Sequence, residues 1–81
     1  MNLVLVEDNI RTRSRIAKLL EQSLADVHIT QLGNLDEALA FAATSKQDYW
    51  LIDLGLPDGS GVDLIRFVRQ QHEKANILVI S

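Results

Sequence analysis

The chain has 81 residues, enough for one small domain that buries roughly 60–65% of the surface exposed by its unfolded form. Its formal net charge is −3 with only 8 lysines and arginines, which argues against a nucleic-acid-binding surface. The absence of cysteine excludes disulfides and thiolate metal sites, and the short apolar run at the N-terminus is typical neither of a signal peptide nor of a membrane span.

The first half of the chain predicts a strand, a helix, a second strand and a second helix. Leu3–Val6 is a short apolar run typical of a strand buried on both faces. A helical pattern follows, and its apolar stripe contains Ile10, Ala17, Leu20 and Leu24. Residues 27–32 alternate in polarity, which favours an edge strand with one solvent-exposed face. Asn34, with Glu37 three residues later, predicts the start of a helix that ends at residues 44–47.

The second half continues the same alternation. Tyr49–Ile52 predicts a third strand, with Trp50 either in the core or, beside a missing helix, at an interface. A third helix opens at Ser60 or Gly61, and residues 76–80 predict a fourth strand. This β-α-β-α-β-α-β order, without repeats, is typical of a parallel α/β sheet. We expect one cytoplasmic domain over residues 1–81.

Acidic residues follow two of the predicted strands. Glu7 and Asp8 come after the first strand, and Asp53 ends the third. Ligands of such sheets bind outside the carboxyl ends of the strands. If the first and third strands are neighbours, their ends lie about 4.8 Å apart and the three carboxylates would converge. Mg²⁺ would relieve their mutual repulsion, with Asp8 and Asp53 as direct ligands and Glu7 acting through water. Asp53 is then a candidate nucleophile toward phosphorus, although an acid after a single strand is more often a solvated loop residue.

The sequence resembles the receiver domain of two-component response regulators along its whole length. Three features carry this resemblance: the acidic run Glu7–Asn9 after LVLV, the stretch DLGLPDGSG at Asp53–Gly61, and Ser81 after ILVI. The resemblance implies a flavodoxin-like, doubly wound parallel sheet in a three-layer α/β/α arrangement, here with four strands and three helices. The strand order is implied by the family.

The resemblance also implies a function. A sensor histidine kinase or phosphotransfer protein would phosphorylate Asp53, and the chain would be a phosphoacceptor rather than an enzyme. Mg²⁺ would be held by Asp8, Asp53 and the main-chain carbonyl of Gly55, with Glu7 assisting through water. Ser81 corresponds to the hydroxyl residue that follows a phosphoryl oxygen when the switch turns on.

Other phosphate-binding classes fit less well. A dinucleotide- or flavin-binding domain would need a glycine-rich loop after the first strand, where this chain has the charged sequence EDNI. A phosphohydrolase of the haloacid dehalogenase type resembles D-x-D, but Gly55 stands two residues after Asp53. A receiver-derived domain that dimerises without phosphorylation remains an alternative.

The resemblance stops before the family domain is complete. The family has five strands and five helices, and its later part carries a lysine that closes on the phosphoryl group. We therefore expect either a fragment or a homodimer, in which a second copy covers the apolar edge strand at residues 77–80 and the sheet beside the first helix. That helix is basic, which indicates either a solvated face or a surface that steers an acidic partner; its cations are Arg11, Arg13, Arg15 and Lys18.

Overall fold

The structure, a computed structural model, describes residues 1–80, so the predicted phosphate-sensing Ser81 lies outside the described residues. Its elements in chain order are β1 (Asn2–Val6), α1 (Ile10–Ser23), β2 (His28–Leu32), α2 (Leu35–Thr44), β3 (Tyr49–Ile52), β4 (Gly55–Leu56), β5 (Gly59–Ser60), α3 (Gly61–Gln71) and β6 (Asn76–Val79). The predicted strands and helices are all present, and the strand ends agree to within one residue. The short antiparallel β4–β5 ribbon is an addition that the sequence did not predict.

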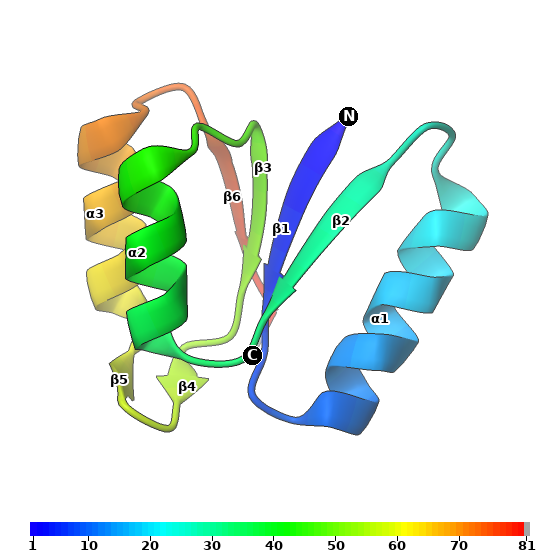
Figure 1. The fold of residues 1–81 in the computed structure, drawn as a ribbon, viewed down its shortest axis with the longest axis horizontal. Coiled ribbons are helices and arrows are strands. Elements are labelled where there is room, and N and C mark those ends of the chain that lie inside the picture. Colours follow the sequence, from blue (N-terminus) through cyan, green and yellow to red (C-terminus); the bar gives the residue numbers. More distant parts are fainter. Residues whose placement is uncertain (81) are drawn as a thin grey trace.

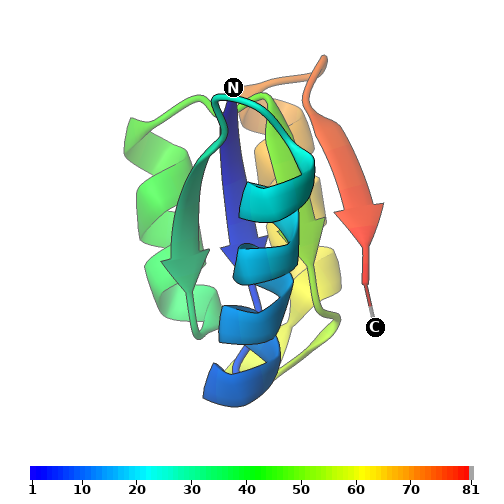
Figure 2. The ribbon, with the colours of Figure 1, turned by 90° about the vertical axis from the view of Figure 1, so that its right-hand side faces the viewer.

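The main sheet is parallel throughout, in the order β2-β1-β3-β6 (Figure 1). Val6, the last residue of β1, is paired with Leu32 of β2 on one side and with Ile52 of β3 on the other. Strand β2 lies at one edge, as predicted, and β6 lies at the other edge within the described residues (Figure 2). The carboxyl ends of β1 and β3 are therefore direct neighbours.

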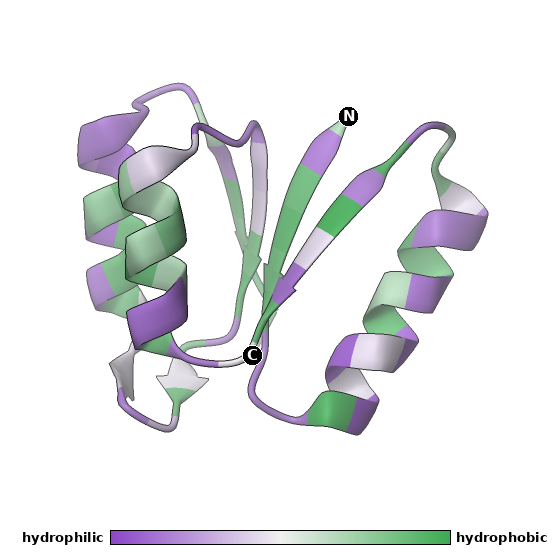
Figure 3. Ribbon diagram, viewed as in Figure 1, coloured by the Kyte–Doolittle hydropathy of each residue, from purple (hydrophilic) through white to green (hydrophobic). Residues whose placement is uncertain are grey.

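Helices cover the two faces of the sheet unequally. Helix α1 lies on one face, and α2 and α3 lie together on the other (Figure 1). Alternate residues of β1 enter separate cores: Leu3 and Leu5 pack with Ala17 of α1, whereas Val4 and Val6 pack toward α2 and α3. The apolar colouring of the central strands in Figure 3 follows from burial on both faces. This confirms the doubly wound, three-layer arrangement.

Trp50 is the largest side chain in the core. It is 2% exposed and meets the ring of Phe41 edge to face, with ring centroids 6.4 Å apart. A buried aromatic pair of this kind adds about 0.5–1.5 kcal/mol to the effect of burial. The predicted core position of Trp50 is therefore confirmed.

Ile10 departs from the expected pattern. The apolar stripe predicts it to be buried with Ala17, but Ile10 is 71% exposed. The first turn of α1 extends past the carboxyl ends of β1 and β2, so no strand lies beneath it (Figure 1). Helical periodicity assigns the correct angular position to Ile10 but does not reveal where the sheet ends.

The start of α2 is capped as the sequence predicts. The Asn34 side chain accepts a hydrogen bond from the Glu37 amide at 2.8 Å. Glu37 Oε1 in turn accepts from the amide of Gly33 at 3.2 Å, one residue before the cap. These reciprocal bonds satisfy main-chain donors that the first turn of a helix leaves unpaired.

A second cap on α2 comes from the loop between β4 and β5. Asp58 Oδ1 accepts from the Leu35 amide at 2.7 Å, and its Oδ2 accepts from the Asp36 amide at 2.8 Å. These two bonds hold the pKa of Asp58 below its ordinary value of 3.8. They also tie the loop that follows Asp53 to the start of α2.

We predict that Asp58→Asn lowers the free energy of unfolding at neutral pH and flattens its dependence on pH in acid. The pKa of Asp58 is lower in the folded chain than in the unfolded one, so the cap contributes stability above the unfolded pKa. That contribution is lost as the pH falls below 3.8 and through the folded pKa. Urea unfolding at a series of pH values measures it. Asp63→Asn, at the first turn of α3, is the control.

No helix within residues 1–80 has the length and apolar character needed to cross a membrane.

Candidate metal centre

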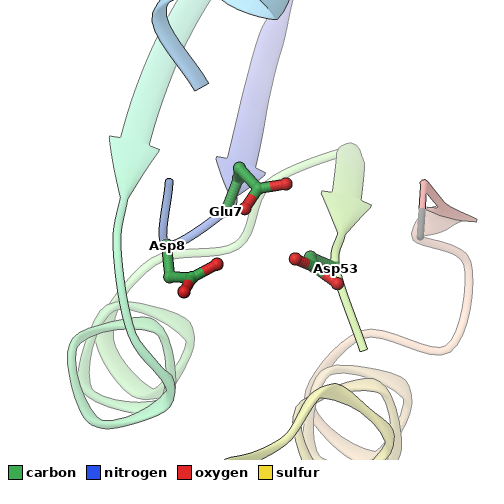
Figure 4. Close-up of side chains that lie close together, drawn as sticks. All are labelled: Glu7, Asp8 and Asp53. Carbon is green, nitrogen blue, oxygen red and sulfur yellow. The ribbon is translucent and has the colours of Figure 1, made fainter. Parts of the chain in front are cut away.

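Glu7, Asp8 and Asp53 converge beyond the C-terminal ends of β1 and β3 (Figure 4). One carboxylate oxygen from each residue lies within 4.8 Å of the other two. The pairing of β1 with β3 produces this arrangement, because the Asp53 amide donates to the Val6 carbonyl at 2.9 Å, one residue beyond Ile52. The predicted cluster is therefore present in the fold.

The cluster concentrates negative charge at a partly dehydrated position. Glu7 is 6% exposed and Asp53 is 7% exposed, whereas Asp8 is open to solvent. Burial raises the pKa of Glu7 above its ordinary value, and the neighbouring Asp8 and Asp53 carboxyl groups raise it further, while a hydrogen bond from the Asn9 amide acts against this. In residues 1–80, no lysine or arginine nitrogen lies within 4.0 Å of the three carboxylates.

This set of donors fits a hard divalent cation. All three residues offer oxygen, and their spacing allows a single ion to contact more than one carboxylate. Mg²⁺ usually keeps several waters and takes only one or two carboxylates, which suits a site with two buried acids and one exposed acid. The exposed side would leave coordination positions accessible to water or to phosphate oxygens.

The loop after β3 orients Asp53. Asp53 Oδ1 accepts a hydrogen bond from the Gly55 amide at 3.0 Å, which leaves the second oxygen available for another contact. The predicted role of Gly55 concerns its carbonyl oxygen and stays a prediction. Gly55 itself begins β4, where it pairs with Ser60, so the loop returns at once to the start of α3.

Gly61 brings the first turn of α3 directly against the Asp53 main chain. Its amide donates to the Leu54 carbonyl at 2.8 Å. A Cβ at this position would lie 2.5 Å from the Asp53 carbonyl oxygen and 2.9 Å from Leu54 Cα. Glycine is therefore required by close packing of main chain on main chain.

One residue at the site was placed incorrectly from the sequence. The basic pattern of α1 assigns Arg13 to the same solvated surface as Arg11 and Arg15, which are exposed. Arg13 is half-buried, and its Nη1 donates to the main-chain oxygen of Glu7 at 2.9 Å. Its position on the first helical turn lets the side chain point back toward the end of β1, but this signal is not sufficient, because Arg11 lies on the same turn and is exposed.

Known proteins of one family match this chain over most of its length. The family model for the response regulator receiver domain matches residues 3–81. The KDP operon transcriptional regulatory protein KdpE of Escherichia coli is 38% identical over 69 residues, which cover 85% of this chain and 30% of KdpE. The cell cycle transcriptional regulator CtrA of Caulobacter vibrioides is 32% identical over 81 residues, covering 100% of this chain and 34% of CtrA. The chain thus spans about a third of these curated relatives.

Solved structures agree with these matches. A response regulator protein from Burkholderia pseudomallei, solved with a phosphorylated aspartic acid, calcium ion and citrate, superposes with a TM-score of 0.85 at 32% identity, covering 96% of this chain and 45% of that chain. The receiver domain of sensor histidine kinase PA1611 from Pseudomonas aeruginosa, with a magnesium ion in its active site cleft, gives a TM-score of 0.86 at 27% identity, covering 99% of this chain and 66% of that one.

Proposed function

Because the chain belongs to the response regulator receiver domain family, we propose that it is a phosphoacceptor of a two-component system, phosphorylated on Asp53. The convergence of Glu7, Asp8 and Asp53 within 4.8 Å carries this proposal. The phosphodonor is a sensor histidine kinase or a phosphotransfer protein, and the reaction takes place in the cytoplasm and depends on Mg²⁺. The relative solved with a phosphorylated aspartic acid and the one with magnesium support the same assignment.

The chemistry proposed for Asp53 is nucleophilic attack on phosphorus. One carboxylate oxygen is held by the Gly55 amide, and the other forms the new P–O bond while the P–N bond of the donor phosphohistidine breaks. Asp8 and Asp53 would hold Mg²⁺, with Glu7 assisting through water. When bound, the ion supplies neutralisation of charge on the phosphoryl oxygens.

Acetyl phosphate tests this proposal without a cognate kinase. Incubation with Mg²⁺ is expected to add one phosphate to Asp53, in an acyl phosphate that hydroxylamine cleaves, and mass spectrometry locates it. Phosphate found on a histidine or on Ser81, and never on Asp53, would contradict the assignment.

Asp8→Asn is expected to weaken Mg²⁺ binding at least about tenfold, because the charge of a direct ligand is lost. Mutations of groups that only orient a ligand typically lower metal affinity by about this factor. Isothermal calorimetry measures the affinity. Asp48→Asn is the matched control: it removes the same charge at the residue before β3, at the opposite end of that strand from Asp53. Equal affinities for wild type and Asp8→Asn would contradict the metal site.

The outer surface of α1 supports a role in docking the phosphodonor. Arg11, Arg15 and Lys18 are exposed there and line a shallow concavity with Ile10 and Ser14. The charges would steer an acidic partner toward the carboxyl edge of the sheet, and Ile10 offers an apolar contact.

A second candidate function, dimerisation without phosphorylation, is favoured by the edge formed by β6. Leu78 is 61% exposed and Val79 is 46% exposed there, and Tyr49 of the adjacent β3 is 39% exposed. Two copies could pair their β6 strands antiparallel about a two-fold axis, or cover this surface face to face.

Sedimentation velocity of the 81-residue chain at micromolar concentration tests this candidate. A dimer is expected, and Leu78→Lys is expected to shift it to monomer. Leu19→Lys places the same charge on α1 at a residue of similar exposure, 57%, and should not change the dimer. A well-folded wild-type monomer would exclude this second function and leave phosphorylation of Asp53 unaffected.

A further inference from the structure

The guanidinium of Arg13 lies between two loops that border the proposed metal site. Its Nη1 donates to the Glu7 carbonyl oxygen at 2.9 Å, so the side chain folds back from the first turn of α1 toward the end of β1. Its Nε is buried without a hydrogen-bond partner in residues 1–80. Burying a charged group while one of its N–H donors has no hydrogen-bond partner is unfavourable for folding. This placement therefore suggests a role other than stability.

The carbonyl that Arg13 holds belongs to the peptide joining Glu7 to Asp8. Because a peptide unit is planar, fixing this oxygen also fixes the amide and the Cα of Asp8. On the other side, the Glu7 amide donates to the Leu32 carbonyl of β2 at 3.0 Å. The main chain that carries two of the three site carboxylates is thus held by β2 and by Arg13.

Gly33 provides the space that the guanidinium occupies. A Cβ on Gly33 would lie 2.8 Å from Arg13 Nη1 and 3.8 Å from its Cζ. Gly33 is itself held, because its amide donates to Glu37 Oε1 at 3.2 Å. Arg13 therefore fills the gap between the loop after β1 and the loop after β2.

A purely electrostatic role for Arg13 would weaken Mg²⁺ binding, whereas a role as a support for Asp8 would strengthen it. In residues 1–80, no arginine nitrogen lies within 4.0 Å of the site carboxylates, so Arg13 contacts main chain and does not form an ion pair with them. A nearby positive charge that acts only through its field opposes the binding of a cation. Removing it would then strengthen Mg²⁺ binding, whereas removing a support for Asp8 would weaken it.

We propose that Arg13 is a positioning residue for the Mg²⁺ site: through the Glu7 carbonyl it holds Asp8 in the orientation that the metal requires. The inference rests on the proposed function, since it assumes that Asp8 is a ligand. Outer-sphere groups that orient ligands typically affect metal affinity about 10–100-fold. Arg13 acts through one peptide unit, so we expect the lower end of this range.

The test compares Mg²⁺ affinities, measured by calorimetry, of Arg13→Met and Arg13→Lys. Both variants are expected to bind about tenfold more weakly than wild type, although Met removes a positive charge and Lys retains it. Arg11→Met is the matched control, because it removes the same charge from an exposed position on the same turn of α1. It should leave the affinity unchanged or raise it. Affinity in Arg13→Met equal to or above wild type would overturn the inference.

Gly33→Ala gives an independent test if the Arg13 variants fold poorly. The added Cβ would displace the flexible guanidinium while keeping its charge, so Mg²⁺ affinity should fall by a similar factor. In an Arg13→Met background the same change should have little further effect, since the group it displaces is gone. Strictly additive losses would contradict a shared mechanism.

A metal-free readout separates this inference from the proposed function. Amide ¹⁵N relaxation is expected to show increased motion at Asp8 in Arg13→Met and unchanged motion in Arg11→Met. If wild type failed to bind Mg²⁺, the proposed metal site would be wrong. The relaxation of the Asp8 amide would then still show whether Arg13 positions this loop. An Asp8 amide as rigid in Arg13→Met as in wild type would overturn the inference.

Discussion

Replacing Asp53 with asparagine is expected to reduce the rate of phosphate incorporation from acetyl phosphate at least about a thousandfold. The amide oxygen of asparagine is a poor nucleophile, and the variant also loses one of the three converging charges. The amide can still accept the Gly55 hydrogen bond, so the loop geometry should be kept. Hydroxylamine-labile phosphate, quantified by mass spectrometry, measures the effect.

The control for Asp53→Asn is Asp63→Asn, an acid at the start of α3 that follows the same loop. It should be phosphorylated at the wild-type rate. Removing Mg²⁺ with EDTA should reduce labelling of both wild type and Asp63→Asn to the level of Asp53→Asn. Residual, Mg²⁺-dependent labelling of Asp53→Asn would show that another residue accepts the phosphate.

The placement of acids at the ends of two buried strands could be predicted because it depends on local patterns. Leu3–Val6 and Tyr49–Ile52 are apolar runs that end in acids, and parallel pairing brings such ends together. That β1 and β3 are neighbours is a property of the whole sheet, and only the family resemblance implied it. The amount of burial also depends on the assembled fold: Glu7 is at least as buried as Asp53, which its sequence neighbours do not reveal.

The contacts that hold the loops could not be read from periodicity. Asp58 caps α2 across 22 and 23 residues of sequence, and Arg13 reaches back to Glu7 from a helix whose other arginines are exposed. Each bond joins a side chain to a main-chain atom in a different element or loop of the chain. Such bonds depend on how the loops meet once the sheet has formed, and any polar side chain nearby would match the local pattern equally well.

Gly61→Ala is expected to have the largest effect on stability, because it alters the packing of main chain beneath Asp53. Alanine is a better helix former than glycine by about 0.8–1 kcal/mol, which on its own would stabilise α3. Its Cβ, however, would lie 2.5 Å from the Asp53 carbonyl oxygen and 2.9 Å from Leu54 Cα, both main-chain atoms that cannot rotate away. We expect a net loss of about 1–3 kcal/mol in the free energy of unfolding.

Urea unfolding of Gly61→Ala measures this loss, and Mg²⁺ binding in the folded variant tests its connection with the site. Because α3 must move away from Asp53 and Leu54, the affinity should fall as well. Gly55→Ala is the matched control for the unfolding measurement: its Cβ would have Asp53 Oδ1 as its nearest atom, at 3.9 Å, an ordinary contact. If Gly61→Ala were as stable as Gly55→Ala, the start of α3 could shift at little cost. Asp53 would then be positioned by its bond to Val6 and by the Gly55 amide, without support from α3.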